Sequence, residues 1–96
     1  MRRPCVIGSS PLQNTALARW LTMLKRVKAQ DIRVNQWQVN ANKTMVGQNR
    51  PDLQFTHGGK RWYIEWDRAS SNRGGSHGAR ILANDPSAHI LIFTLD

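Results

Sequence analysis

Three acidic residues gather in one short segment of a strongly basic chain. The chain has 96 residues, with 14 Lys and Arg against 6 Asp and Glu, and its formal net charge is +8. Three of the six acids, Asp52, Glu65 and Asp67, lie in the segment RPDLQFTHGGKRWYIEWDRAS, which spans residues 50–70. Clustered carboxylates suit a divalent cation that prefers oxygen ligands, and they also serve as general acids and bases.

The two glycines between these acids predict how the carboxylates are arranged. Gly58-Gly59 is typical of a two-residue β-hairpin turn. Such a turn places Asp52 directly across from Glu65, with Cβ atoms about 5 Å apart, and leaves Asp67 on the same face. Three like charges this close repel one another, so we expect them to share a cation or a proton. The alternative is an exposed face on which Lys and Arg neutralise the acids.

The elements around this hairpin predict a single α+β domain over residues 10–96, preceded by a linker over residues 1–9. The opposite face of the hairpin is apolar and is expected to form core: Leu53, Phe55, Trp62, Ile64 and Trp66. Periodicity and capping residues predict, in order, a helix to about residue 29, strands at 32–41, 50–56 and 60–68, a helix at 77–85 and a buried strand at 88–95.

Composition narrows the class of protein. The charge favours an anionic partner, with nucleic acid ahead of a membrane surface or an acidic protein. The single cysteine, Cys5, cannot form an internal disulfide. No apolar run reaches the ~18 residues of a membrane span, and the first residues do not form a signal peptide. We therefore expect no membrane insertion by this domain, which works in the cytoplasm or within a larger exported protein.

The motif of Pro-Asp, twelve residues and Glu-Trp-Asp resembles the PD-(D/E)XK nuclease superfamily. The expected order of helix, three strands, helix and strand matches the common core of that family, over residues 10–95. The resemblance implies that Asp52 and Glu65 bind a divalent metal, Mg²⁺ first, with Mn²⁺ or Zn²⁺ as alternatives. The metal would polarise a phosphate and activate a water.

The third motif position departs from the family. Asp67 stands where the family has Lys. Asp67 is therefore expected to be a further metal ligand, with the cationic role passing to Lys60, Arg68 or Arg80.

The segment SNRGGSHGARILANDP adds a second resemblance, together with NRPD and YIEWD. It looks like the C-terminal toxin domains of bacterial polymorphic toxins, including contact-dependent inhibition and Rhs types. That resemblance implies a nuclease, often of tRNA, which is secreted as part of a larger toxin. It would act in the target-cell cytoplasm and be neutralised by an acidic immunity protein.

Several basic residues are candidates for nucleic-acid recognition. His77 and Arg80 lie three residues apart on the second predicted helix, so they could serve as acid or base and as phosphate ligand. We expect Arg68, Arg73 and Arg80 to contact both nucleic acid and inhibitor. The further candidates for nucleic-acid contacts are Arg50, Lys60 and Arg61.

Three hypotheses for function follow. The first is a metal-dependent nuclease, RNA before DNA, with Asp52, Glu65 and Asp67 at the metal. The second is a metal-independent endoribonuclease, similar to the YEWD and His stretch of ribosome-cleaving colicins, in which Glu65, Asp67 and His77 are acid and base. The third is a non-enzymatic nucleic-acid-binding domain, which uses basic and aromatic residues alone.

Overall fold

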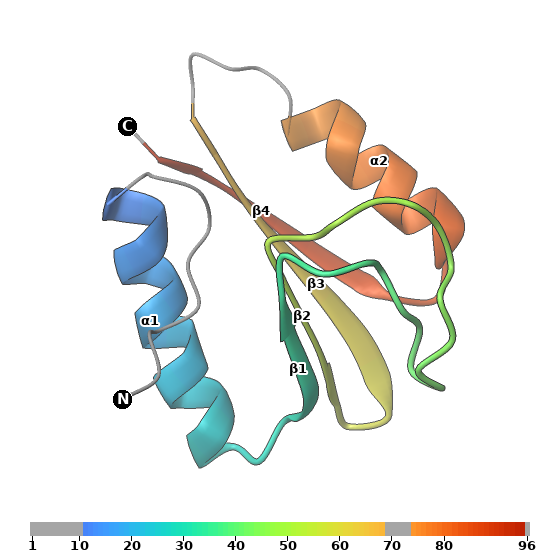
Figure 1. Ribbon diagram of the computed structural model, residues 1–96, viewed down its shortest axis with the longest axis horizontal. Coiled ribbons are helices and arrows are strands. Elements are labelled where there is room, and N and C mark those ends of the chain that lie inside the picture. Colours follow the sequence, from blue (N-terminus) through green and yellow to red (C-terminus); the bar gives the residue numbers. More distant parts are fainter. Residues whose placement is uncertain (1–10, 69–73, 96) are drawn as a thin grey trace.

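The chain forms an α+β domain with the element order that the sequence predicts. The computed structural model describes residues 11–68 and 74–95, so the expected linker at residues 1–9 lies outside the described residues. In chain order the elements are α1 (Pro11–Arg26), β1 (Gln30–Val34), β2 (Leu53–His57), β3 (Lys60–Arg68), α2 (Gly74–Asn84) and β4 (His89–Leu95) (Figure 1).

The four strands form one mixed sheet in the order β1-β2-β3-β4. β2 pairs antiparallel with both β1 and β3, whereas β4 runs parallel to β3 after the crossover through α2. The two helices lie on opposite sides of the sheet, with α2 and the loop between β1 and β2 on the same side (Figure 1). The domain therefore has three layers: α1 covers one face of the sheet, and α2 with the loop between β1 and β2 covers the other.

The hairpin of β2 and β3 has the register that its turn predicts. Gly58 and Gly59 have φ angles of 63° and 75°, and positive φ at both turn positions is the signature of a type I′ turn. His57 pairs with Lys60, and the pairing continues to Leu53 and Ile64. The predicted apolar face is confirmed as the main core.

The main core lies between α1 and the sheet. Leu17 and Leu24 lie seven residues apart on one face of α1 and are fully or almost fully buried. They pack with Leu53, Phe55, Ile64 and Trp66, and Trp62 packs against this cluster. An apolar stripe of this kind is what orients α1 over the hairpin.

The first helix ends three residues earlier than expected. Lys28 has a φ of 59°. The Ala29 backbone N–H donates to the Leu24 carbonyl oxygen at 2.9 Å, and the Lys28 N–H donates to the Lys25 carbonyl oxygen at 3.2 Å. This pair of hydrogen bonds is a Schellman motif, with Lys28 in the left-handed position where glycine is usual.

The predicted strand at residues 32–41 is wrong beyond Val34. Asn35, with a φ of 50°, leaves the extended conformation, and residues 35–52 form a long loop that contains only an isolated bridge between Val39 and Met45. The register of β1 against β2 shifts between Gln30 and Arg33. The second strand also begins later than expected, at Leu53, and α2 begins three residues earlier, at Gly74.

The prediction that the last strand is buried is wrong as well. Within the described residues β4 is an edge strand, because its one neighbour in the sheet is β3. Leu91 packs against the core, whereas Ile92 and Phe93 are exposed. An apolar run does not distinguish a central strand from an edge strand. Neither described helix is long and apolar enough to span a membrane.

The Schellman motif predicts that Lys28→Gly stabilises the domain. Glycine removes the steric cost of a side chain in the left-handed region, so we expect a gain of about 0.5–1 kcal/mol in the free energy of unfolding. The matched control is Lys25→Gly, one position before the end of α1, which should lose about 1 kcal/mol. Urea unfolding of the two variants measures both values, and equal losses in both would contradict the assigned helix end.

Candidate active site

The carboxylates of Asp52 and Glu65 meet at the open end of the hairpin. Asp52 precedes β2 by one residue, and the register of β2 with β3, continued by one position, sets it opposite Glu65. The Trp66 backbone N–H donates to Asp52 Oδ2 at 2.8 Å, which fixes this carboxylate beside β3. The structure therefore confirms that Asp52 and Glu65 face each other across the hairpin.

Burial and like charge act together on Glu65. Glu65 is only 5% exposed. The pKa of Glu65 is raised to about 9, first by burial, then by the neighbouring charge of Asp52 and a hydrogen bond with the Asp52 side chain, while a hydrogen bond with the Asp52 backbone acts in the opposite direction. Asp67, half-buried and two residues along the strand, adds a smaller repulsion. At neutral pH the pair therefore holds a proton unless a cation replaces it.

A residue from α1 reaches the same end of β3. Gln13 Nε2 donates to the Trp66 carbonyl oxygen at 2.7 Å. No local signal could have linked it to a strand 53 residues away in the chain. The contact ties the first turn of α1 to the backbone next to the carboxylate pair.

The donor atoms of this site suit a hard cation. Within residues 11–68 and 74–95, no group of three or more His, Cys, Asp or Glu side chains could hold a metal ion. Asp67 is therefore not placed as a third ligand beside Asp52 and Glu65. Two carboxylates remain, and Mg²⁺ is commonly bound by one or two carboxylates together with waters and substrate phosphates. The pair fits that mode of binding.

The other candidates lie in different places. Lys60 is exposed beside the hairpin turn, five residues along β3 from Glu65, which is about 17 Å in an extended strand. A lysine side chain cannot cross that distance, so Lys60 does not replace the motif lysine. Arg80 is exposed on α2, and Arg50 is exposed two residues before Asp52. Arg73 and the side chains of Arg68 and His77 lie outside the described residues.

Arg61 is a structural residue in this fold and not an open phosphate contact. It is 2% exposed. Its guanidinium donates to the Val39 carbonyl oxygen at 3.0 Å, to Gln54 Oε1 at 2.8 Å and to Thr56 Oγ1 at 3.0 Å. It also donates to the Asp31 carbonyl oxygen at 3.0 Å and lies 3.3 Å from the Asp31 carboxylate. The expected role of Arg61 in binding nucleic acid is not supported by this placement.

Beside the hydrogen bonds of Arg61, Tyr63 forms further buried hydrogen bonds that reach the end of α2. The Tyr63 hydroxyl oxygen lies 2.6 Å from the Val39 carbonyl oxygen and 2.7 Å from Asp85 Oδ2. Burial and the hydrogen bond to Asp85 raise the pKa of Tyr63, so its proton stays in place. Gln38 Nε2 donates to the Ile81 carbonyl oxygen at 2.9 Å. These bonds fasten the loop of residues 35–52 to both the sheet and α2.

Comparison with known proteins does not assign the chain to a family. No family model, curated protein or solved structure matches it.

The placement of Arg61 predicts a stability defect for Arg61→Ala. The change leaves several buried acceptors without a donor, so we expect a loss of about 3 kcal/mol or more in the free energy of unfolding. Lys60→Ala, the same loss of charge at an exposed neighbour, should stay within about 0.5 kcal/mol of the wild type. Urea unfolding checks both. If Arg61→Ala were as stable as Lys60→Ala but bound nucleic acid more weakly, Arg61 would be a binding residue after all.

The raised pKa of Glu65 predicts how stability depends on pH in the absence of divalent cations. The folded protein keeps a proton that the unfolded chain releases above the ordinary pKa of 4.5. The stabilisation is fully present below 4.5 and is lost as the pH rises toward about 9. The slope should reach at most about 1.4 kcal/mol per pH unit.

Glu65→Gln should remove this slope, because an amide does not titrate. Urea unfolding in chelator, from pH 5 to 9, gives the free energy of unfolding of the wild type and of Glu65→Gln. Subtracting one from the other cancels the titration of groups that the two proteins share. Asp67→Asn is the matched control and should keep most of the slope, since Asp67 makes the smallest contribution to the shift. A wild type that becomes more stable with rising pH relative to Glu65→Gln would contradict the assignment.

Proposed function

We propose that this domain is a metal-dependent nuclease that cuts a phosphodiester bond, in RNA before DNA. One observation carries the proposal: a pair of carboxylates, half-buried Asp52 and buried Glu65, at the open end of a hairpin in a chain of net charge +8. A basic domain that only bound nucleic acid would gain nothing from burying two acids side by side, because their repulsion and desolvation oppose folding.

The topology supports the same proposal. The order α1, β1, β2, β3, α2, β4, with an antiparallel hairpin followed by a parallel crossover strand, agrees with the PD-(D/E)XK core that the sequence motif implies. Here Asp52 directly precedes β2, and Glu65 lies within β3.

The residues have separate tasks in this proposal. Asp52 and Glu65 would hold a divalent cation, Mg²⁺ or Mn²⁺. When bound, the cation polarises a phosphate and increases the acidity of a water. Glu65 must release its proton for the cation to bind, so proton and cation compete for the same carboxylates. Arg68 and Arg80 stay as predicted replacements for the motif lysine.

A metal-independent ribonuclease is the second candidate, and one observation favours it. A pKa of about 9 keeps Glu65 protonated at neutral pH, as a general acid requires. In that mechanism the RNA 2′-OH attacks the adjacent phosphate and Asp67 or His77 takes its proton, while the P–O5′ bond breaks and Glu65 protonates the leaving 5′ oxygen.

The biological setting remains part of the proposal. We infer a toxin domain delivered within a larger secreted protein, active in the target-cell cytoplasm and blocked by an acidic immunity protein. Exposed basic side chains support it, because opposite charges speed association. Among the described residues these include Arg50, Lys60 and Arg80.

A cleavage assay on total RNA, purified tRNA and plasmid DNA tests the proposal. We expect cleavage that a chelator abolishes and that Mg²⁺ or Mn²⁺ restores. Asp52→Asn and Glu65→Gln should each lower the rate by about 100-fold or more, since several kcal/mol of charge stabilisation are lost. Asp85→Asn is the control for the loss of a buried carboxylate elsewhere and should keep the activity of the wild type while folded.

The alternatives give different results in the same assay. Full activity in excess chelator, lost in Glu65→Gln, would support the metal-independent mechanism instead. Tight binding without cleavage, equal in the wild type and both carboxylate variants, would leave the domain as a non-enzymatic binding protein. Because each variant is isosteric and its folding can be checked by melting, loss of activity is not confused with loss of structure.

A further inference from the structure

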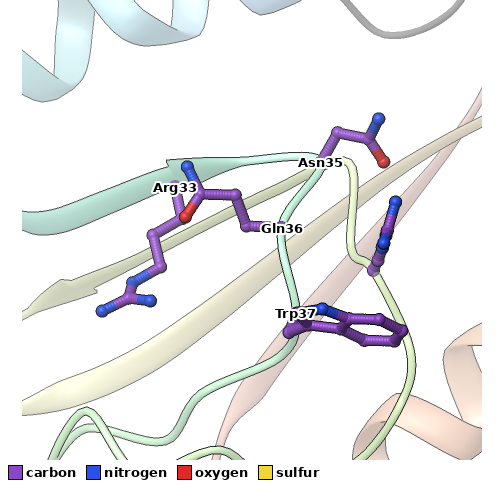
Figure 2. A pocket seen from close by; sticks show the side chains of 5 residues that line it. Arg33, Asn35, Gln36 and Trp37 are labelled. Carbon is purple, nitrogen blue, oxygen red and sulfur yellow. The ribbon is translucent and has the colours of Figure 1, made fainter.

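An open pocket with an exposed tryptophan lies at the loop that follows β1. The pocket has a volume of about 290 Å³. Figure 2 shows the ring of Trp37 and the amide of Asn35 toward one side of it and Arg33 toward the other. This volume is near the lower end for small-molecule sites, which suits a single nucleotide and not a duplex. Its lining residues are Arg33, Asn35, Gln36, Trp37 and Arg50.

The aromatic ring of this pocket is paired with a cation. Trp37 is 43% exposed, although large aromatic side chains usually bury most of their surface. The Arg50 guanidinium lies 4.4 Å from the centre of the Trp37 ring. An arginine stacked on an exposed indole presents a flat surface that carries positive charge, which favours both a nucleobase and a phosphate.

The backbone beneath Trp37 is held by buried side chains. Gln54 Nε2 donates to the Trp37 carbonyl oxygen at 3.0 Å and to the Gln36 carbonyl oxygen at 3.1 Å. The Gln38 N–H donates to the Asn49 carbonyl oxygen at 2.9 Å, which brings the chain before Arg50 against the chain after Trp37. The stacked pair is therefore positioned before any ligand binds, and the ordering cost on binding is small.

The pocket carries positive charge that is only partly neutralised. Arg33 donates to Asp31 Oδ1 at 2.9 Å. No ion pair joins Arg50 to an acidic side chain within residues 11–68 and 74–95. Arg50 is thus the cation of this pocket that is most open to a phosphate.

The pocket lies next to the carboxylate pair. The Asn35 backbone N–H donates to the Asp52 carbonyl oxygen at 3.1 Å, which continues the pairing of Val34 with Leu53. Neighbouring strands are about 5 Å apart, so Asn35 lies about 10 Å from Glu65 across the sheet. A strand of nucleic acid bound in the pocket would pass beside the two carboxylates.

We propose that this pocket binds one unpaired nucleotide of the substrate strand. The base stacks on the Trp37–Arg50 pair, the amide of Asn35 lies on the same side as its polar edge, and Arg50 also contacts the adjacent phosphate. The substrate is therefore single-stranded, or a loop in which a base can leave its stack. This inference rests on the proposed nuclease function, because the strand bound here is the strand presented to Asp52 and Glu65.

Binding of single-stranded RNA tests the pocket without cleavage. The measurement uses the Glu65→Gln protein in chelator and a short single-stranded RNA that contains 2-aminopurine, whose fluorescence falls when the base stacks. We expect Trp37→Ala to weaken binding by at least about fivefold and to abolish the quenching. Trp37→Phe should retain most of both. Arg50→Ala should weaken binding and flatten its dependence on salt.

Matched controls come from the same chain. Met45→Ala removes an exposed apolar side chain from the same loop, and Arg26→Ala removes an exposed arginine at the end of α1. Met45→Ala should leave affinity within about twofold, whereas Arg26→Ala should cost no more than a single general charge. Duplex RNA should bind Trp37→Ala and its parent equally well.

The outcomes separate the pocket from the nuclease proposal. Wild-type affinity and quenching in folded Trp37→Ala would overturn the pocket, even if the protein cleaves RNA. If the pocket served only to bind an acidic protein partner, Trp37→Ala would likewise keep the RNA affinity and quenching of its parent. Trp37-dependent binding by a protein that never cleaves would overturn the nuclease and leave the pocket in place.

Discussion

The tight turn at Gly58 and Gly59 constrains every other part of this domain. Both residues have positive φ, and a two-residue turn of this type permits one register between β2 and β3. A shift by one residue would move Phe55 and Ile64 away from α1 and put polar side chains in their place. The same register determines that Asp52 meets Glu65. The turn therefore determines both which residues form the core and where the two carboxylates lie.

The two faces of the sheet are stabilised by different forces. The face under α1 is apolar and is held by burial of Leu17, Leu24 and their partners. The other face is covered by α2 and by an irregular loop, whose backbone groups need partners when they are buried. Gln54 and Arg61 supply those partners, so polar residues occupy strand positions where an apolar sheet face would be usual. The loop that carries Trp37 depends on these hydrogen bonds from Gln54 and Arg61.

The carboxylate pair opposes the stability of the fold that contains it. Burial and mutual repulsion raise the pKa of Glu65, and the protein retains a proton to lower that cost. A cation would replace the proton and remove the repulsion. Unfavourable charge of this kind is frequent at functional sites, which supports the nuclease proposal over simple binding. The Trp37–Arg50 pair, which we propose to hold a nucleotide of the substrate, lies near the same end of the sheet.

Local signals in the sequence were enough for part of this structure. The turn glycines and the alternation of β2 and β3 predicted the hairpin register, the residues of the main core and the approach of Asp52 to Glu65, and the order of helices and strands was predicted correctly. These features depend on residues close in the chain, or on a pairing that a short turn dictates. Tertiary structure decided the burial of Arg61, the irregular loop after Val34, the edge position of β4 and the contact of Gln13 with Trp66. Each depends on which distant segment covers a given face, and neither propensity nor alternation contains that information, because a buried arginine and an exposed one look alike until their partners are known.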